Sequence, residues 1–382
     1  MRNKTVILFF IGLLTFQSSV TAQSLQLKKG VRLQQSGSVK SKTYQLPTAS
    51  LEAPVIVVAG DNITIDFKNA LLQGDAPQQL PDSYEGLGIL IENSNNVTIR
   101  NLRVRGYKVG LMARNVRNLR LENCDFSYNY RQRLNSTILK EDEVDWMSYH
   151  HNEKDEWLRY GAGIYFRDCD SAKVLNCKVT GGQNALMMTA CNGSEILNND
   201  FSFNSGIGIG LYRSSNNLIA HNKTNFNVRG YSHGIYHRGQ DSAGFLVYEQ
   251  SNNNTFYKNS ATHSGDGFFL WAGQSTMDNG QGGCNDNLIV GNDFSYAPTN
   301  GIEVTFSRNI ISRNRLFDCD HGIWGGYSFE TRIADNQFRN NRIAIAIEHG
   351  QSNIIDFNIF HRDKEAIRLW ARATQPDDWG GM

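Results

Sequence analysis

Short segments of alternating apolar and polar residues return along this chain about every 22 residues. Each segment begins at a glycine or an alanine, and the residues one and three places later are apolar. Residues two apart on a strand point to the same face, so the alternation predicts short strands with one inward apolar face. These apolar pairs are Ile89/Ile91, Ile164/Phe166, Leu186/Met188, Ile209/Leu211, Phe245/Val247, Phe268/Leu270, Ile302/Val304, Ile345/Ile347 and Ile367/Leu369.

Two columns of residues mark the period. The glycine column is Gly88, Gly110, Gly163, Ala185, Gly208, Gly244, Gly267, Gly301, Gly322, Ala344 and Ala366. The asparagine column is Asn101, Cys124, Cys177, Asn199, Asn222, Asn259, Asn292, Asn314, Asn336 and Asn358. An asparagine amide at each turn can hydrogen-bond the asparagine of the next rung, so the second column predicts a ladder along a stack.

Short parallel strands with turns at a constant offset predict an all-β solenoid, a single-stranded parallel β-helix of about ten 22-residue rungs. A propeller is excluded because its blades repeat at roughly 40 residues or more. The rung motif N-x-F followed by N-G-I, as in residues 292–302, resembles the pectate-lyase-like superfamily of right-handed parallel β-helices. The resemblance covers residues from about 60 to 370.

This resemblance implies a right-handed helix and a choice among several activities. The superfamily includes polysaccharide lyases, polygalacturonase-type hydrolases, uronate epimerases, phage tailspikes and a periplasmic group linked to copper-enzyme maturation. A shared fold does not choose among them.

The ends of the chain predict export and capping. Arg2 and Lys4 precede an apolar run over residues 6–16, too short to cross a bilayer, and small residues end at Ala22. We therefore expect a signal peptide over residues 1–22, a secreted or periplasmic protein, and no membrane insertion after cleavage. Residues 23–60 are expected to cap a helix that spans residues 61–370. The tail, residues 371–382, either caps the other end or marks a truncation.

The composition of the chain limits the classes of partner that it is expected to bind. A net charge of +1 gives no electrostatic case for nucleic acid or lipid. The 35 glycines and 6 prolines suit many tight turns. Cys124 and Cys177 occupy neighbouring positions of the asparagine column. We expect both to be small buried free thiols, and a disulfide between them is the alternative.

Three insertions interrupt the period, at residues 128–160, 226–243 and 273–284. All three flank the glycine strands, and loops on a rigid solenoid commonly carry function. The second insertion leaves a choice of register, because Gly234 also resembles the start of a strand. Gly244 is preferred, since it places Phe245 and Val247 inside, whereas Gly234 would place His237 inside.

The outward positions, two and four after the glycine column, are rich in aromatic residues. Exposed rings beside charged groups are typical of sugar-binding surfaces. The alternative is that the inserted loops cover this strip. The predicted substrate-binding residues are Tyr165, Arg167, Tyr248, Phe269, Trp271 and Trp324.

Candidate catalytic residues fall into two sets. Hydrolysis needs two carboxyl groups roughly 5 to 10 Å apart, and Asp266, Glu303 and Glu348 are the outward candidates. The polygalacturonase pattern is absent, and His321 after Asp320 is only a partial echo of it. A uronate lyase or epimerase needs a base and a cation, which the second insertion offers as His233, Tyr236 and Arg238.

The sequence thus predicts an enzyme that cleaves a polysaccharide or oligosaccharide by lyase or hydrolase chemistry. A uronate epimerase, a non-catalytic glycan-binding or adhesive stalk and, least favoured, a metal-handling protein are the alternatives. The last rests on the histidine-rich loops and on Met187 and Met188. We expect no cofactor and assign no metal ligands, while metal dependence and the oligomeric state are left open.

Overall fold

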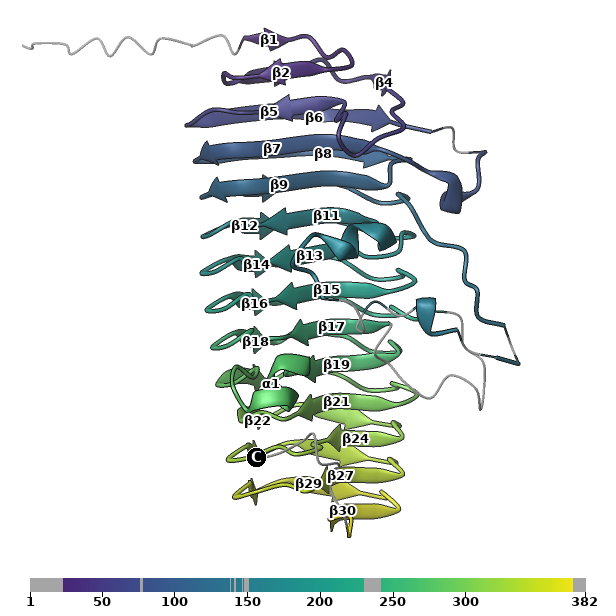
Figure 1. The fold of residues 1–382 in the computed structure, drawn as a ribbon, viewed down its shortest axis with the longest axis vertical. Coiled ribbons are helices and arrows are strands. Elements are labelled where there is room, and N and C mark those ends of the chain that lie inside the picture. The colour runs from purple at the N-terminus through teal and green to yellow at the C-terminus, as the bar shows by residue number, and fades with distance from the viewer. Residues whose placement is uncertain are drawn as a thin grey trace, which may run out of the picture.

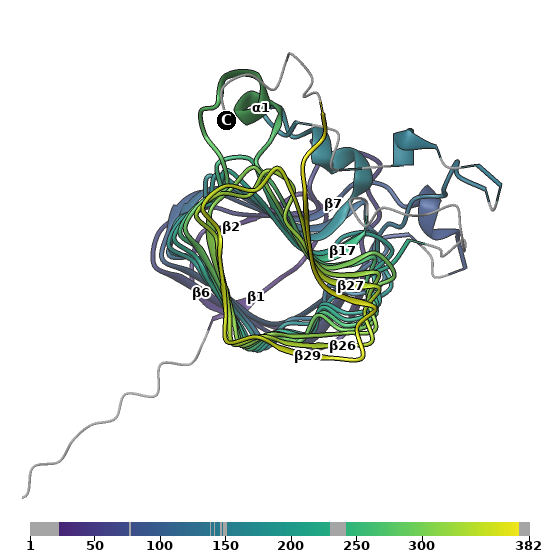
Figure 2. The same ribbon diagram turned by 90° about the horizontal axis from the view of Figure 1, so that it is seen from below.

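A computed structural model describes residues 23–373 except 76–77, 138, 141, 146, 148–150 and 230–241. The chain coils into a right-handed parallel β-helix whose rungs stack along one long axis (Figure 1). Viewed along that axis, the rungs superimpose around one shared interior (Figure 2). The predicted fold is confirmed. Residues 1–22, the expected signal peptide, lie outside the described residues.

Three parallel sheets form the walls of the helix. The first sheet contains β1 (Ser24–Leu25), β3 (Gly37–Val39), β4 (Thr43–Gln45), β6 (Ile63–Gln73), β8 (Val97–Arg105), β10 (Arg120–Glu122), β12 (Lys173–Leu175), β14 (Glu195–Leu197), β16 (Leu218–Ala220), β18 (Thr255–Tyr257), β20 (Asn287–Val290), β22 (Asn309–Ser312), β25 (Arg332–Ala334) and β28 (Ile354–Asp356). The second sheet contains β2 (Val31–Leu33), β5 (Ile56–Val58), β7 (Leu87–Asn95), β9 (Val109–Arg117), β11 (Ala162–Arg167), β13 (Leu186–Thr189), β15 (Ile207–Tyr212), β17 (Ala243–Tyr248), β19 (Asp266–Trp271), β21 (Asn300–Thr305), β24 (His321–Trp324), β27 (Ile343–Glu348) and β30 (Glu365–Trp370). The third sheet contains β23 (Arg315–Phe317), β26 (Gln337–Arg339) and β29 (Ile359–His361).

Helical segments occur only as short pieces among the described residues. The one α-helix there is α1 (Gln274–Asn279), and 3₁₀ turns lie at Pro81–Ser83, Glu143–Asp145 and Glu156–Tyr160. None of these helices has the length and apolar character needed to cross a membrane.

The stack is longer than the ten or so rungs predicted, because the second sheet has 13 strands. Two of them, β2 and β5, come from residues 23–60, so the segment expected to cap the helix itself contributes strands to both long sheets. At the other end, Ile367 and Leu369 of β30 are exposed although they occupy inward columns.

The glycine column marks equivalent positions in successive rungs, as predicted. Phe245 pairs with Ile209 and Phe268, which confirms the register that begins at Gly244. Glycine is required by crowding between rungs. A Cβ on Gly208 would lie 2.5 Å from the carbonyl oxygen of Gly244, and one on Gly267 would lie 2.6 Å from that of Gly301.

The asparagine column forms the predicted ladder inside the turn. Both the backbone N and Nδ2 of Asn222 donate to Oδ1 of Asn259, at 2.9 and 3.1 Å. Asn259 donates to Oδ1 of Asn292 in the same way, through its backbone N and its Nδ2. Its Nδ2 also donates to the carbonyl oxygen of Ile219 at 2.8 Å. A second buried ladder, not predicted, runs through Asn217, Asn254, Asn287 and Asn309 at another turn.

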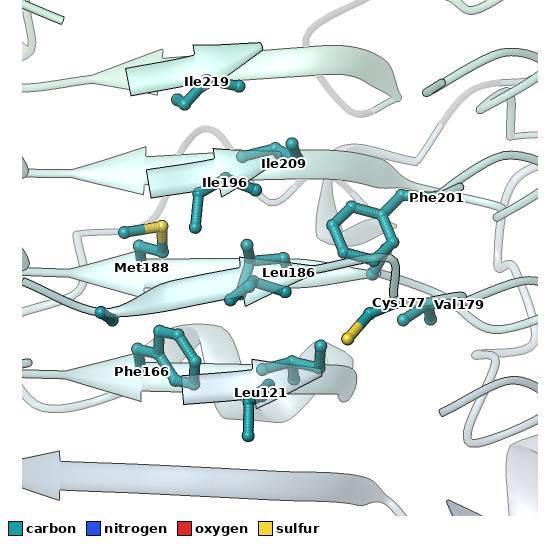
Figure 3. Close-up of a cluster of buried hydrophobic side chains, with 14 of the residues drawn as sticks. Leu121, Phe166, Cys177, Val179, Leu186, Met188, Ile196, Phe201, Ile209 and Ile219 are labelled. Carbon is teal, nitrogen blue, oxygen red and sulfur yellow. The ribbon is translucent and has the colours of Figure 1, made fainter. Parts of the chain in front are cut away.

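Apolar side chains from all walls fill the interior (Figure 3). Phe166, Leu186 and Ile196 come from neighbouring rungs and are fully buried. Cys124 and Cys177 lie in the same interior as free thiols, as the favoured prediction has it. Burial raises the pKa of Cys177 well above its ordinary value.

Replacing Asn259 with alanine is predicted to destabilise the fold by about 2–4 kcal/mol, because it leaves buried backbone and amide groups without partners. Urea denaturation measures this loss. Asn279→Ala on α1 is the control and should cost under about 1 kcal/mol. Equal losses in the two variants would contradict a stabilising ladder.

All six cysteines are buried free thiols. A thiol reagent should therefore modify none of them in the native protein and all six after denaturation without reductant. Fewer than six reactive thiols in the denatured protein would indicate a disulfide.

Candidate functional site

The outward face of the second sheet has a covered half and an open half. Over β11 to β17 the first insertion packs against it, and Figure 1 shows its helical turns in front of β11 and β13. Trp157 of this insertion is buried, with its ring 5.5 Å from that of Tyr212. The sequence predicts exposed binding rings here, and this is wrong for Tyr165, Tyr248 and Phe269, which are buried. Packing the insertion on them removes a large apolar surface from water.

Polar contacts fix the insertion in place. Asn152 is fully buried, and its Nδ2 donates to the hydroxyl of Tyr165 at 2.9 Å. The Tyr165 hydroxyl donates to Asp155 at 2.7 Å, and Arg167 donates to the same carboxylate at 2.6 Å. Tyr165 and Arg167, both predicted to bind substrate, therefore hold the insertion on the sheet.

A charged cluster lies where the insertion meets the end of β17. Nη2 of Arg213 donates to Glu249 at 2.7 Å and to Glu153 at 2.9 Å. The hydroxyl of Tyr212 donates to Glu153 at 2.8 Å. His151 lies beside both carboxylates, with Nδ1 3.6 Å from Glu249 Oε2 and 3.9 Å from Glu153 Oε1. Within the described residues, His151, Glu153 and Glu249 are the three side chains close enough together to hold a metal ion.

Among the described residues, the open half runs from the end of β19, where Trp271 is partly exposed, to β30. Trp271, Trp324 and Trp370 are partly exposed there, in line with the predicted aromatic surface. Trp324 lies 5.5 Å from Trp370 and 5.1 Å from the ring of His321, measured between ring centroids. Trp271 and Trp324 lie on β19 and β24, the strands that also carry Asp266 and His321, and Glu303 lies on β21 between them.

Asp266 is the first residue of β19 and is fully buried. Its Oδ1 accepts hydrogen bonds from the hydroxyl of Thr299 and from the backbone N of Asn300. Its Oδ2 has no hydrogen-bond partner. Burial raises the pKa of this carboxyl group from 3.8 to about 7, although the two hydrogen bonds oppose the shift. Asp266 therefore keeps its proton to a much higher pH than an exposed aspartate does.

Asn300 joins the three predicted residues. Its backbone N contacts Asp266 at 2.8 Å, its Nδ2 donates to Glu303 Oε2 at 2.7 Å, and its Oδ1 lies 3.0 Å from Nδ1 of His321. Asp266, Glu303 and His321 come from three successive rungs and meet around this one residue, the first at its backbone N and the other two at its side chain.

His321 is held as a neutral imidazole. Nη2 of Arg342 lies 2.7 Å from its Nε2, and arginine can only donate, so Nε2 carries the lone pair and Nδ1 the proton. Burial lowers the pKa of His321 to about 4, which the neighbouring Asp320 opposes and Arg342 and Arg368 reinforce. Arg342 is itself bound to Asp320 at 2.6 Å.

The other predicted catalytic residues are not part of this group. Glu348 is buried at the far end of β27 and forms an ion pair with Arg372. His233, Tyr236 and Arg238 lie outside the described residues.

The sequence analysis missed Asn300, although a signal for it exists. The position just before each glycine also points outward, and it is apolar at Leu87, Val109, Ala162, Ile207 and Ala243, which pack in the covered cluster. Asn184, before Ala185, is the polar exception there, and the same position is polar in three successive rungs at Asp266, Asn300 and His321.

Comparisons with known proteins agree with the fold. The family model of the right handed beta helix region matches residues 87–281 and 241–377. The A-module of mannuronan C-5 epimerase AlgE6 from Azotobacter vinelandii superimposes with a TM-score of 0.62 at 11% identity, over 90% of this chain and 92% of that one. The AlgE4 A-module from the same organism gives 0.60 at 12%, over 90% and 91%.

The surface protein and adhesin PfbA of Streptococcus pneumoniae gives a TM-score of 0.54 at 12% identity, over 91% of both chains. At such identities these likenesses show a shared fold and nothing finer. No curated protein sequence matches the chain significantly.

The raised pKa of Asp266 predicts a pH-dependent stability. A folded-state pKa of about 7, above the ordinary 3.8, means that the protonated form stabilises the fold. This contribution is fully present below about pH 4 and is lost as the pH rises through about 7. We expect the wild type to lose roughly 4 kcal/mol of unfolding free energy over this range from this group.

Asp266→Asn should remove that component, so its stability should fall less between pH 4.5 and 8 when followed by urea denaturation. Asp278→Asn on the exposed face of α1 is the control and should keep the wild-type pH dependence. Identical pH profiles for the wild type and Asp266→Asn would contradict a protonated Asp266.

Proposed function

The chain belongs to the family of right handed β-helix regions, and on that premise we propose that it is an exported enzyme that hydrolyses a polysaccharide bound along the open half of the second sheet. One observation carries the proposal: Asn300 holds Asp266, Glu303 and His321 together beside partly exposed tryptophans.

The two carboxyl groups have environments that suit different roles. Asp266 is buried and retains a proton near neutral pH, as a general acid must. Glu303 accepts a hydrogen bond from the amide of Asn300, which stabilises a carboxylate. Asn300 donates to one oxygen of each group, from its backbone N to Asp266 and from Nδ2 to Glu303. Glycosidase pairs lie roughly 5 to 10 Å apart.

In this mechanism Asp266 gives its proton to the glycosidic oxygen of the leaving sugar, which requires substrate binding to uncover a carboxyl group that is fully buried in this structure. Glu303 acts on the opposite side of the anomeric carbon, either by activating water or by attacking directly. His321 is a positioning residue, because its Nδ1–H holds Oδ1 of Asn300 and so directs the amide toward Glu303. Trp324 and Trp370 offer ring surfaces on which sugar units stack.

The structural neighbours are compatible with this proposal without deciding it. Two are mannuronan C-5 epimerases and one is a surface adhesin, so this fold supports both sugar chemistry and adhesion. A protonated buried carboxyl group favours catalysis over adhesion, since an adhesive surface has no use for a perturbed acid.

A uronate lyase is the second candidate, and one observation favours it. The neutral imidazole of His321 lies beside Arg342 and Arg368, a base next to cations that could neutralise a uronate carboxylate. Both arginines are already paired, with Asp320 and Glu365 respectively, which ranks this chemistry below hydrolysis.

The test is activity of the chain from Gln23 on a panel of neutral and uronate polysaccharides. Release of reducing ends is followed together with absorbance of unsaturated uronates. Hydrolysis predicts reducing ends without absorbance, and activity that falls as the pH rises through about 7. Asp266→Asn and Glu303→Gln should each lower kcat by roughly 10²–10⁴-fold.

Glu330→Gln, in another part of the surface, is the control and should keep full activity. A rise in absorbance would support the lyase instead. Binding without either signal would leave a glycan-binding protein, and variants as active as the wild type would refute the assigned site.

A further inference from the structure

We propose that His151, Glu153 and Glu249 form a binding site for a divalent transition metal such as zinc, which fastens the first insertion to the end of β17. The sequence analysis assigns no metal ligands, so this site was not predicted from the sequence. It is independent of the proposed hydrolysis, because it lies at the opposite end of the strands from Asp266.

The three donor atoms face one another without bonding one another. His151 Nδ1 lies 3.6 Å from Oε2 of Glu249 and 3.9 Å from Oε1 of Glu153, and all three ligand atoms lie within 4.8 Å of each other. Around zinc, with bonds of about 2.0–2.2 Å, ligand atoms sit roughly 3.3–3.6 Å apart. The side chains of His151 and Glu153 are about half exposed, 50% and 41%, so they can close this difference.

Glu249 is the fixed ligand. Its side chain is 2% exposed and accepts hydrogen bonds from Arg213 and Ser275, and the Tyr212 hydroxyl oxygen lies 3.2 Å from its Oε2. A Cβ on Gly273 would lie 2.9 Å from Cγ of Glu249, so glycine at that position leaves room for the buried carboxylate. Hydrogen bonds that hold a ligating carboxylate from behind are a regular feature of metal sites.

The charges of the cluster also favour a cation. Two carboxylates face a single guanidinium, that of Arg213, and a neutral imidazole would leave the group one charge negative. Imidazole with carboxylates selects zinc and similar metals, whereas calcium and magnesium prefer oxygen ligands alone. A protonated His151 is the competing way to balance the charge.

A metal here has a structural consequence. His151 and Glu153 belong to the insertion, only a few residues before Trp157, which covers Tyr212 and Tyr248. Glu249 directly follows β17. The metal would therefore tie the covering segment to the sheet and keep the aromatic strip of the covered half away from water.

The experiment is titration of the chelator-treated chain from Gln23 with zinc chloride at pH 7.5 by calorimetry, with thermal unfolding alongside. We expect one zinc per chain and a raised Tm. His151→Gln and Glu249→Gln should each weaken binding roughly ten-fold or more. Calcium chloride should neither bind at this site nor raise the Tm.

His263→Gln removes an exposed histidine far from the cluster and should bind zinc as the wild type does. Because Glu249→Gln alters a buried group and can fail to fold, the half-exposed His151→Gln variant is the deciding one. Absence of zinc binding to the wild type, or unchanged binding by His151→Gln, would overturn the proposal.

Discussion

The stacking of rungs in register is the constraint on which the rest of this structure depends. Parallel strands can pair along the whole axis only if the turns between them also satisfy their buried polar groups. Asn222, Asn259 and Asn292 do this by donating both to the next asparagine and to a strand carbonyl one rung back. Glycine at the start of most strands of the second sheet then permits the close approach of rungs that this pairing requires.

Because the register is fixed, equivalent positions of successive rungs line up in a column along the surface. The candidate site lies where the residues of one such column change from apolar to polar. The position before the glycine or alanine is apolar in five of the six rungs from Leu87 to Ala243, with Asn184 as the exception, and is polar in three successive rungs at Asp266, Asn300 and His321. Side chains over 50 residues apart in sequence are brought together in this way without any special loop. The site therefore depends on the ladders as directly as the fold does.

Sequence reasoning recovered the features that depend on local periodicity. The two columns, the inward apolar pairs and the register at Gly244 follow from spacing alone, since packing and crowding act identically in every rung. The exposure of Tyr165, Tyr248 and Phe269 could not be predicted in this way. Alternation identifies the outward face of a strand, but whether another segment covers that face depends on how an aperiodic insertion folds.

Within the site, the sequence predicts Asp266, Glu303 and His321 from their chemistry alone. That all three contact Asn300 is visible only in the three-dimensional structure. Asn300 itself has an unremarkable side chain in a chain rich in asparagine, so only its column reveals it. Glu348 illustrates the opposite error, because an outward carboxylate is as well suited to an ion pair with Arg372 as to catalysis.

The unsatisfied carboxyl oxygen of Asp266 is the strongest argument that this part of the surface does more than support the fold. The ladders show how thoroughly buried amides are paired in this molecule, and among the described side chains Oδ2 of Asp266 is the buried carboxyl oxygen left without a hydrogen-bond partner. The equivalent position one rung earlier is Ala243, so the fold does not require a carboxyl group there. A buried acid that weakens the protein at alkaline pH and fills no structural need is explained by a chemical role. Its neighbours on Asn300, a carboxylate and a neutral imidazole, are the groups that an acid of this kind works with.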